Sequence, residues 1–578
     1  MSRAAGKTLT DCREFLSRCP LLEEVHIVVS RGLLHWSSAL RSSSPACLLF
    51  PFTDNPVTLE DLRNTISKIG PIQLKDEEEQ DYLRVLQAMH DSVQRILDEE
   101  DYYPIPDRVR FPREDIYYPA KEDNELGAWA WRYTLKDVQT DATTTGPLAG
   151  RTVCLKDCVG VADVPCLLGT EVITDYVPKT DATIVTRLLE AGATIIGQSV
   201  CENMCTFSVS FSAATGPVHN PYARGRNAGG SSSGSAALVA AQQVDLAIGA
   251  DQGGSIRMPS ALCGCVGLKP TFGLVPYTGI ASNESTNDHT GPITRTVLDN
   301  ALMLQVIAGA DGIDDRQGAG CPFPKDVPKY VDQLLASRHK SLEGMKIGIL
   351  REGLDMSSVD PRVHAKVVES AMKFKELGAT VEEISIPLHK EGPIYHLTVG
   401  RMAGYLSRMG QASSRKELYL TELTDKFVPW TQQKWDKLWP TASNVMINGA
   451  YCWDKWPSLY GKTQNLLRKL RDAYDDKLAT YDVIILPTVP QVAGTLGSQS
   501  DRPMDKLAKT VGQNLNCAMF NQTGHPALTL PIGMLPPHDG PEDLLLPVAF
   551  QIIGKHFDES TIYRAALAWE DRFNWKDL

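Results

Sequence analysis

Residues 226–272 read RNAGGSSSGSAALVAAQQVDLAIGADQGGSIRMPSALCGCVGLKPTF. This stretch holds two Gly/Ser segments, Gly229–Ser235 and Gly253–Ser255, separated by an Ala-rich run typical of a helix and an apolar run, Asp245–Ile248, typical of a strand. Glycines let a backbone bend tightly and approach a ligand, and neighbouring serines can be nucleophiles, helix caps or turn residues. A single Gly/Ser segment is typical of a linker, but two segments joined by regular elements predict a functional site.

The composition and net charge exclude several classes of protein. The chain has 578 residues, which is too long for one ordinary core and predicts two or more domains, or one large domain with appendages. Its net charge of -12 argues against nucleic-acid binding. No apolar run is long enough for a membrane span, no secretory signal is evident, and the C-terminal residues match no retention tail. We therefore expect a cytoplasmic protein.

The thirteen cysteines are scattered along the chain, unlike those of a small disulfide scaffold. They include three close pairs: Cys154 and Cys158, Cys201 and Cys205, and Cys263 and Cys265. The first two spacings would permit a metal site, but buried cysteines that pack as small apolar side chains are the favoured interpretation. We expect free thiols and no metal.

From Gly146 onward, apolar runs typical of strands alternate with helical patterns. The helix predicted over 183–191 has Asp181 as its cap and Gly192 as its stop, and another helix is predicted over 363–377. Alternation of this kind predicts an α/β fold with a largely buried sheet flanked by helices. The predicted strands are 151–155, 194–198, 245–248, 346–350, 381–386 and 483–486, and two closing strands are predicted over 525–531 and 546–553.

The N-terminal part has a different pattern. Residues 1–65 show no clear periodicity and are interpreted as a variable extension. A helix is predicted around 78–100, with acidic residues 77–79 at its start, where the helix dipole favours negative charge. Apolar residues fall on one face of that helix and are interpreted as core packing: Tyr82, Leu86, Met89, Val93 and Ile96.

The two Gly/Ser segments and the Arg-Met-Pro and Lys-Pro-Thr residues after them form one long pattern. It resembles the signature of the amidase signature family of serine hydrolases, with a resemblance that runs from about Gly146 to the C-terminus and is strongest over 156–311. The resemblance implies a central mixed sheet sandwiched by helices. The chain resembles nitrile-metabolism amidases, which carry a helical N-terminal extension, and, more distantly, fatty acid amide hydrolase. It divides the chain into a helical region over 66–145 and a catalytic domain over 146–578, in which helical residues 395–480 lie near the substrate entrance.

The resemblance also implies a Ser–Ser–Lys triad, which maps onto Lys156, Ser231 and Ser255. Ser255 follows two glycines, which would let it present its hydroxyl as the nucleophile. Ser231 would relay the proton to Lys156, with Ser232 as the competing relay, and the family pattern implies a cis Gly230–Ser231 peptide bond. A lysine is a base only when neutral, so we expect burial to lower the pKa of Lys156.

The loop around the nucleophile supplies candidate donors for an oxyanion. The N–H groups of Gln252, Gly253, Gly254 and Ser255 could converge on one point, and small residues are required there because a side chain would block a ligand. With Ser231 and Met204, these residues are the predicted substrate-binding set. Core packing is the alternative for Met204 and for Phe207.

Three further positions match or depart from the family pattern. Asp251 and Arg257 match it and are interpreted as a structural pair that braces the loop. Ser233 stands where the family usually has glycine, and we expect its hydroxyl to cap the following helix.

These residues predict an amidase that hydrolyses small or aromatic carboxylic amides to an acid and ammonia or an amine, without metal or organic cofactor. One alternative is the A-type subunit of a tRNA-dependent amidotransferase, which would need partner chains and tRNA. Others are a non-catalytic binding relative and an esterase. Related amidases are often dimers, so a homodimer is compatible with the resemblance.

Overall fold

The computed structural model describes residues 54–578, which belong to two compact units, one that ends at Tyr102 and one that begins at Tyr103. The expectations for residues 1–53, most of the predicted variable extension, lie outside the described residues. No helix of the described part is both long and apolar enough to cross a membrane.

The described part of the first unit contains two helices, α2 (Leu59–Ile69) and α3 (Asp76–Leu97). The first turn of α3 is acidic, as predicted, and one of its residues, Glu79, forms an ion pair of 2.7 Å with Arg63 on α2. The interpretation of the apolar stripe as core packing is wrong for Tyr82, Met89 and Ile96, which are 53%, 57% and 70% exposed. Helical periodicity identified the face of α3 but not its burial.

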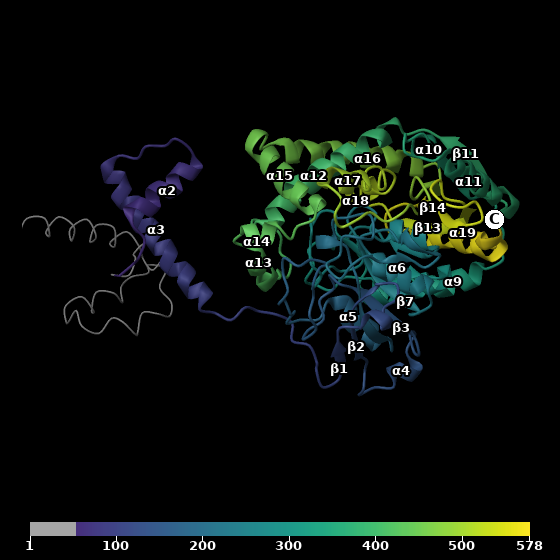
Figure 1. Ribbon diagram of the computed structural model, residues 1–578, viewed down its shortest axis with the longest axis horizontal. Coiled ribbons are helices and arrows are strands. Elements are labelled where there is room, and N and C mark those ends of the chain that lie inside the picture. Colours follow the sequence, from purple (N-terminus) through teal and green to yellow (C-terminus); the bar gives the residue numbers. More distant parts are fainter. Residues whose placement is uncertain (1–53) are drawn as a thin grey trace, which may run out of the picture. The chain divides into compact units, whose positions relative to one another are not determined.

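The second unit is built on one twelve-stranded mixed sheet, with the strand order β1-β2-β4-β3-β7-β9-β8-β13-β14-β12-β10-β11. Figure 1 shows it passing through the unit, from β1 and β2 at one end to β11 at the other. Strand β3 is parallel to β4 and β7, and β10 is parallel to β11 and β12, whereas the other pairs are antiparallel. The strands are β1 (Arg113–Tyr117), β2 (Trp129–Leu135), β3 (Thr152–Lys156), β4 (Thr194–Ser199), β7 (Leu246–Asp251), β8 (Val266–Lys269), β9 (His289–Thr294), β10 (Lys346–Leu350), β11 (Thr380–Ile384), β12 (Val483–Pro487), β13 (Ala527–Leu535) and β14 (Leu546–Ile553).

Helices cover both faces of the sheet. Along β3, Val153 and Leu155 belong to one apolar cluster and Cys154 to another, so successive side chains of this strand are buried on opposite faces. The longer helices are α5 (Thr183–Glu190), α6 (Ser233–Ala240), α7 (Arg257–Cys263), α8 (Val297–Ile307), α9 (Tyr330–Ser337), α11 (Pro361–Met372), α12 (Gly392–Arg408), α13 (Thr421–Phe427), α15 (Pro440–Lys455), α16 (Leu459–Leu478), α17 (Pro503–Ala508) and α19 (Glu559–Arg572).

All eight predicted strands are present within four residues at each end, and the central mixed sheet between helices is confirmed. The predicted cap of α5 is wrong, because α5 begins after Ala182 without a side-chain cap. The Asp181 carboxylate instead accepts a hydrogen bond from the Ala162 N–H at 2.8 Å and pairs with Arg113. Asp181 therefore joins its own loop to the loop of Ala162 and to the start of β1.

The sequence predicts a helical region over 66–145, but the structure shows that this region is only partly helical. It contributes strands β1 and β2 to the edge of the sheet, and β2 pairs with β4. Trp129 and Leu135 at the two ends of β2 are buried. Residues from Tyr103 onward therefore belong to the same unit as the sheet.

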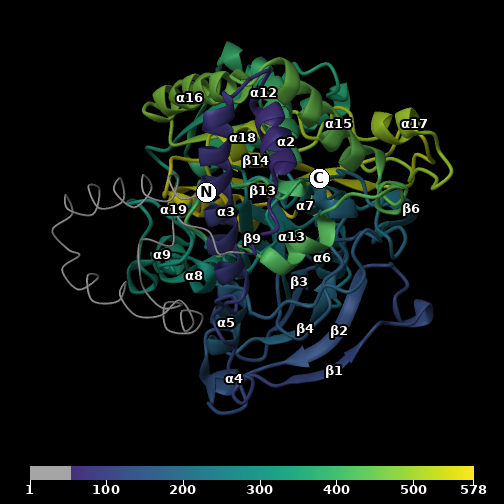
Figure 2. The same cartoon turned by 90° about the vertical axis from the view of Figure 1, so that its left-hand side faces the viewer.

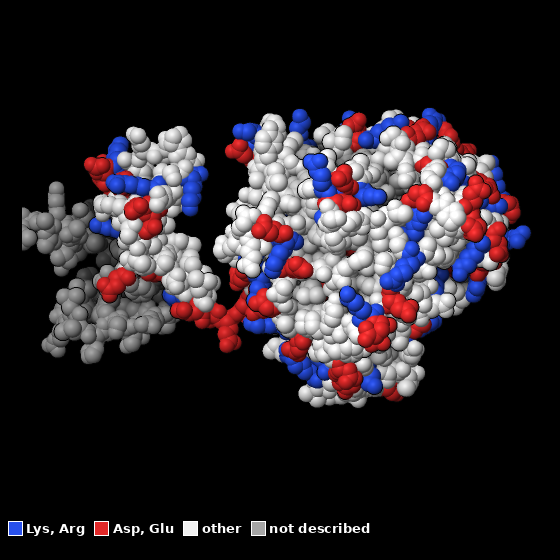
Figure 3. All heavy atoms as spheres, in the orientation of Figure 1, with Lys and Arg blue, Asp and Glu red and all other residues white. Residues whose placement is uncertain are grey.

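The helical pattern over 395–480 is confirmed. Figure 2 shows α12, α15 and α16 together above the sheet, and α12 packs against both of the others. Acidic and basic side chains intermingle over the face of this unit that Figure 3 shows, without a broad area of one sign.

Candidate active site

Lys156 is the last residue of β3, and its side chain is fully buried. Its Nζ donates to Ser231 Oγ at 2.8 Å and to the Ala250 carbonyl at 3.1 Å. Strand β7, which ends at Asp251, lies beside β3, so the sheet brings the lysine next to both Gly/Ser segments. The predicted contact between Lys156 and Ser231 is therefore present.

Two adjacent serines were candidates for the relay, and the structure distinguishes them. The Ser232 hydroxyl is held by the Ala250 backbone, to whose carbonyl it donates at 3.2 Å. Of these two serines, Ser231 is the one whose hydroxyl is hydrogen-bonded to Lys156 in the described structure. The Gly230–Ser231 peptide bond is cis, as predicted.

The second Gly/Ser segment is held by a buried ion pair. Asp251 and Arg257 are both fully buried and lie 3.1 Å apart. The Asp251 carboxylate also accepts the Gly254 N–H at 2.6 Å and the Ile256 N–H at 3.0 Å. Burial raises the pKa of Asp251, but the Arg257 charge and hydrogen bonds from Arg257 and Asn521 outweigh it and hold the pKa below its ordinary value. This confirms the interpretation of a structural pair that braces the loop.

Ser255 lies in this braced loop, just before α7, and is 8% exposed. Its carbonyl accepts the Ser232 N–H at 3.2 Å, which joins the two Gly/Ser segments through their backbones. Between the hydroxyls of Ser231 and Ser255 the described structure has no hydrogen bond. The nucleophile candidate is thus near the Lys156–Ser231 pair with its hydroxyl uncommitted within the described residues.

The four predicted oxyanion donors are not equivalent. The Gly254 N–H is already bound to Asp251, whereas no acceptor is found among residues 54–578 for the N–H groups of Gln252, Gly253 and Ser255. A Cβ on Gly253 would lie 2.8 Å from His396 Nε2, so a larger residue would collide with the imidazole. Three backbone donors therefore remain in a loop that requires glycine.

The expected capping role of Ser233 is wrong. Its hydroxyl donates to Glu202 Oε1 at 2.8 Å instead of binding a backbone N–H at the start of α6. Glu202 is fully buried, accepts the Ser212 hydroxyl at 2.6 Å, and donates its own N–H to the Ser231 carbonyl at 3.1 Å. Burial raises the pKa of Glu202 to about 7, although hydrogen bonds from Ser212 and Ser233 and the charge of Lys156 lower it. The serine thus connects the first segment to a buried carboxyl group.

Neighbouring thiols change the electrostatics of Lys156. Burial lowers the pKa of its ammonium group, but negative charge on Cys205, Cys158 and Cys201 raises it, and the net shift is upward. The expected lowering considered burial alone and missed this sulfur cluster, in which Cys205 Sγ lies 3.6 Å from Cys201 Sγ. Sulfur carries charge only as a thiolate, so a neutral Lys156 requires these cysteines as thiols.

Met204 lies beside a small cavity. It is buried in the left-handed region with φ 49°, and it lines a space of about 30 Å³ together with Cys205, Asn283, Arg408 and others. Phe207 packs instead in an aromatic cluster with Phe211 and Trp439. Core packing therefore describes Phe207, whereas Met204 faces free space.

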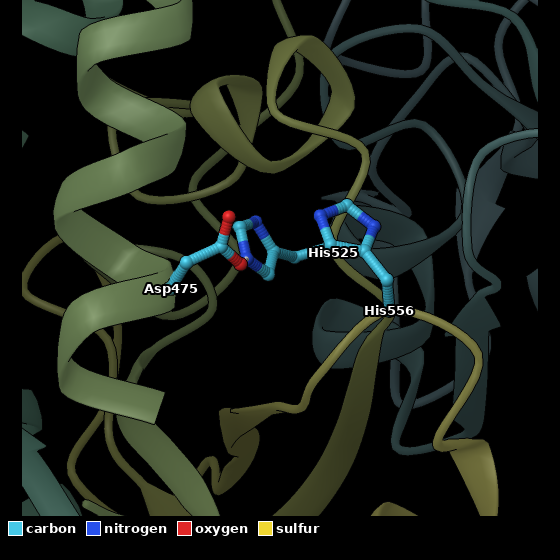
Figure 4. Close-up of side chains that lie close together, drawn as sticks. All are labelled: Asp475, His525 and His556. Carbon is cyan, nitrogen blue, oxygen red and sulfur yellow. Dashed lines mark hydrogen bonds and ion pairs between the residues drawn. The ribbon is translucent and has the colours of Figure 1, made fainter. Parts of the chain in front are cut away.

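Two groups of side chains in the described residues have ligand atoms close enough for a metal: Asp475 with His525 and His556, and Asp314 with Asp315 and Glu417. Figure 4 shows the first group, in which the His525 ring lies between Asp475 on α16 and His556. Both ring nitrogens of His525 are engaged, since Nε2 is 3.0 Å from Asp475 and Nδ1 is 2.9 Å from Thr523 Oγ1. Burial lowers the pKa of His556 to about 3. Hydrogen bonding within the protein accounts for the buried histidine.

Sequence reasoning missed two residues that organise the site. Glu202 follows β4, and its sequence context has no motif that marks it. Asn521 donates to the Asp251 carbonyl at 2.7 Å and accepts from Arg257 Nη2 at 2.6 Å. It lies 270 residues from Asp251, so only the fold brings it there.

A family model described as Amidase matches residues 128–563. The chain is 39% identical to an enantioselective amidase of Rhodococcus rhodochrous over 78% of this chain and 84% of that protein. It is 36% identical to the A subunit of a glutamyl-tRNA(Gln) amidotransferase of Exiguobacterium sibiricum, over 73% and 84%. The solved structure of a native peptide amidase from Stenotrophomonas maltophilia has a TM-score of 0.57 and 26% identity, over 74% and 83%.

The fold and these similarities define the class of the protein as an amide hydrolase. The chain belongs to the amidase family, in which a Ser–Ser–Lys triad is characteristic.

Proposed function

We propose that the chain hydrolyses small or aromatic carboxylic amides to an acid and ammonia or an amine, with Ser255 as nucleophile, Ser231 as relay and Lys156 as base. The observation that carries this proposal is the 2.8 Å hydrogen bond from a fully buried Lys156 Nζ to Ser231 Oγ, next to the loop of Ser255. The similarity to the Rhodococcus rhodochrous amidase supports the reaction type.

In the proposed reaction a proton moves from Ser255 through Ser231 to Lys156 during attack, and a proton moves back along the same path when the amine leaves. Ser255 Oγ attacks the amide carbon as its proton passes to Ser231 Oγ and the Ser231 proton passes to neutral Lys156. The N–H groups of Gln252, Gly253 and Ser255 stabilise the oxyanion, a role in which one donor typically contributes about 2.7–4 kcal/mol. The same path returns a proton to the departing nitrogen, and water then hydrolyses the acyl-enzyme to the acid.

The experiment measures ammonia release from benzamide, acetamide and indole-3-acetamide by the isolated chain. We expect Ser255→Ala and Lys156→Ala each to lower kcat by at least about a thousandfold, because triad members act as a unit. Ser231→Ala should also be strongly impaired. Ser232→Ala is the matched control and should stay within about tenfold of the parent, since its hydroxyl only binds the Ala250 backbone. Parental turnover by either Ser255→Ala or Lys156→Ala would overturn the assignment.

The 36% identity to an amidotransferase A subunit favours a second candidate function, in which the chain is a glutaminase that works with partner chains. That candidate predicts glutamine as the substrate and little ammonia release without partners. Turnover of the three simple amides by the isolated chain decides against it.

A further inference from the structure

The imidazole of His396 lies over Gly253, in the loop of residues 252–255 that carries the candidate oxyanion donors. His396 is on α12, which packs against the short helix α18 (Ala518–Gln522). A Cβ on Gly253 would lie 2.8 Å from His396 Nε2 and 2.9 Å from its Cε1. Helix α12 therefore brings a ring nitrogen to the loop that supplies three backbone donors.

The neutral ring of His396 carries its proton on Nε2. The amide nitrogen of Gln522 lies 3.3 Å from His396 Nδ1. An amide nitrogen can only donate, so Nδ1 accepts and the ring proton is on Nε2. Burial, with a smaller contribution from the charge of Arg401, lowers the pKa of His396 to about 4. At neutral pH the nitrogen that faces Gly253 is therefore an uncharged N–H donor.

This donor has no acceptor within residues 54–578, where Gln522 is the one hydrogen-bond partner of the ring. A second side-chain donor lies beside it. Asn514 Nδ2 would be 3.5 Å from the same Cβ on Gly253, and the Asn514 side chain forms no hydrogen bond in the described part of the chain. Two donors that converge on one glycine without acceptors of their own indicate where an acceptor of the ligand binds.

One oxygen atom can accept from both His396 and the backbone of Gly253. A Cβ lies roughly 2.5 Å from the nitrogen of its own residue, and His396 Nε2 is 2.8 Å from the Cβ position, so Gly253 N and Nε2 are at most about 5.3 Å apart. Two hydrogen bonds of about 2.9 Å to a shared oxygen span up to about 5.8 Å. The separation therefore allows a shared acceptor.

We propose that His396 is a further catalytic residue, whose Nε2–H group donates to the oxyanion that forms when Ser255 attacks the amide. Negative charge develops on the carbonyl oxygen only during attack, so a donor held in place stabilises the transition state more than the bound amide. His396 keeps its proton throughout. The inference rests on the proposed hydrolysis at Ser255 and adds a side-chain donor to the three backbone donors.

The experiment measures kcat and KM for the amide that the parent turns over fastest. His396→Leu should lower kcat roughly a hundred- to a thousandfold and leave KM within about threefold, as expected for an oxyanion donor. His396→Gln again offers an N–H group and should recover at least about tenfold of that loss. The matched control is His364→Leu, at a partly buried histidine of α11 without a side-chain hydrogen bond in the described residues, and it should stay within about twofold of the parent.

Binding of 2,2,2-trifluoroacetophenone, followed by calorimetry, tests the same contact without amide turnover. The Ser255 hydroxyl adds to the ketone carbon, its proton passes through Ser231 to Lys156, and the ketone oxygen becomes an oxyanion. Acetophenone keeps its carbonyl and serves as the comparison. His396→Leu should weaken binding of the fluorinated ketone roughly a hundredfold and that of acetophenone by less than about threefold.

A parental kcat in His396→Leu, a loss confined to KM, or equal weakening of both ketones overturns the inference. If the leucine variant does not fold, His396→Phe keeps a ring over Gly253, lacks the N–H group and should show the same losses. A parent that binds the fluorinated ketone through His396 but hydrolyses no amide would overturn the proposed function and leave the donor role of His396 standing.

Discussion

The two Gly/Ser segments are similar in composition, but the protein holds them by different means. The second, around Gly253–Ser255, is braced by the Asp251–Arg257 ion pair, both members of which are fully buried. The first, around Gly230–Ser233, is attached to Glu202, a buried carboxyl group that has hydroxyl and N–H donors but no ion-pair partner among the described residues.

Because of this difference, we expect the second segment to keep its geometry at neutral pH and the first segment to respond to pH. The pKa of Asp251 lies below its ordinary value, so its charge and the loop geometry persist at neutral pH. The pKa of Glu202 is about 7, so the group that holds the relay segment changes charge in the neutral range. The loop that supplies the oxyanion donors is thus fixed, whereas the loop of the relay serine has a neighbour that titrates.

The largest effect is expected from Asp251→Asn, which removes the charge that balances buried Arg257. Breaking a buried ion pair on one side typically costs about 3–5 kcal/mol. Asparagine also offers one acceptor oxygen where Gly254, Ile256 and Arg257 now share two. We expect the free energy of unfolding, from urea titrations of the second unit, to fall by about that amount.

Glu383→Gln is the control for this change, because Glu383 pairs with Arg351 at 2.6 Å while both side chains are more than half exposed. Exposed pairs contribute about 0–1 kcal/mol. If the two variants lost similar stability, the second segment would not depend on its ion pair, and the contrast with the first would disappear.

Glu202→Gln should have a smaller effect that depends on pH. Burial raises the pKa of Glu202 from an ordinary 4.5 to about 7, so between these values the folded protein binds a proton that the unfolded chain has released. Its contribution to stability is therefore fully present below pH 4.5 and is lost as pH rises through 7, a change of about 3 kcal/mol. A glutamine side chain does not titrate in this range, so the Glu202→Gln variant should lack this pH-dependent contribution to stability.

The measurement is the difference in free energy of unfolding between the parent and Glu202→Gln at several pH values from 4.5 to 8. Other buried acids, such as Glu284 with a pKa raised by burial to about 7, cancel in that difference. A difference that stays constant over this range would show that Glu202 does not titrate there.

Much of the fold could be predicted because the strands have local apolar patterns. The predicted strand 346–350 matches β10 at both ends. Strands β8 and β9 were not predicted, since Gly267, Gly291 and Pro292 interrupt their apolar runs, and pairing within the sheet stabilises them instead. The exposure of Tyr82 on α3 could not be predicted either, because periodicity indicates a face but not what covers it.

The residues of the candidate site likewise fall into those that the sequence could identify and those that it could not. Lys156, Ser231 and Asp251 carry motif signals, and the structure brings the first two into contact. Glu202 and Asn521 have no signal, because long-range folding alone brings them to the loops. The direction of the Lys156 pKa shift was missed for the same reason, since Cys205 is remote in sequence yet raises it.

The smallest effect is expected from Ser233→Ala, which tests the hydrogen bond that distinguishes the first segment. Loss of one donor to Glu202 should cost about 1 kcal/mol, since Ser212 still binds the carboxyl group. The Ser233 hydrogen bond lowers the pKa of Glu202, so its removal should move the pH dependence measured above to higher pH. Ser235→Ala removes another buried hydroxyl on α6, bound to Ser199 at 2.7 Å, and should leave that dependence unchanged. An equal shift in both variants would mean that helix packing, and not the Ser233–Glu202 contact, links the first segment to pH.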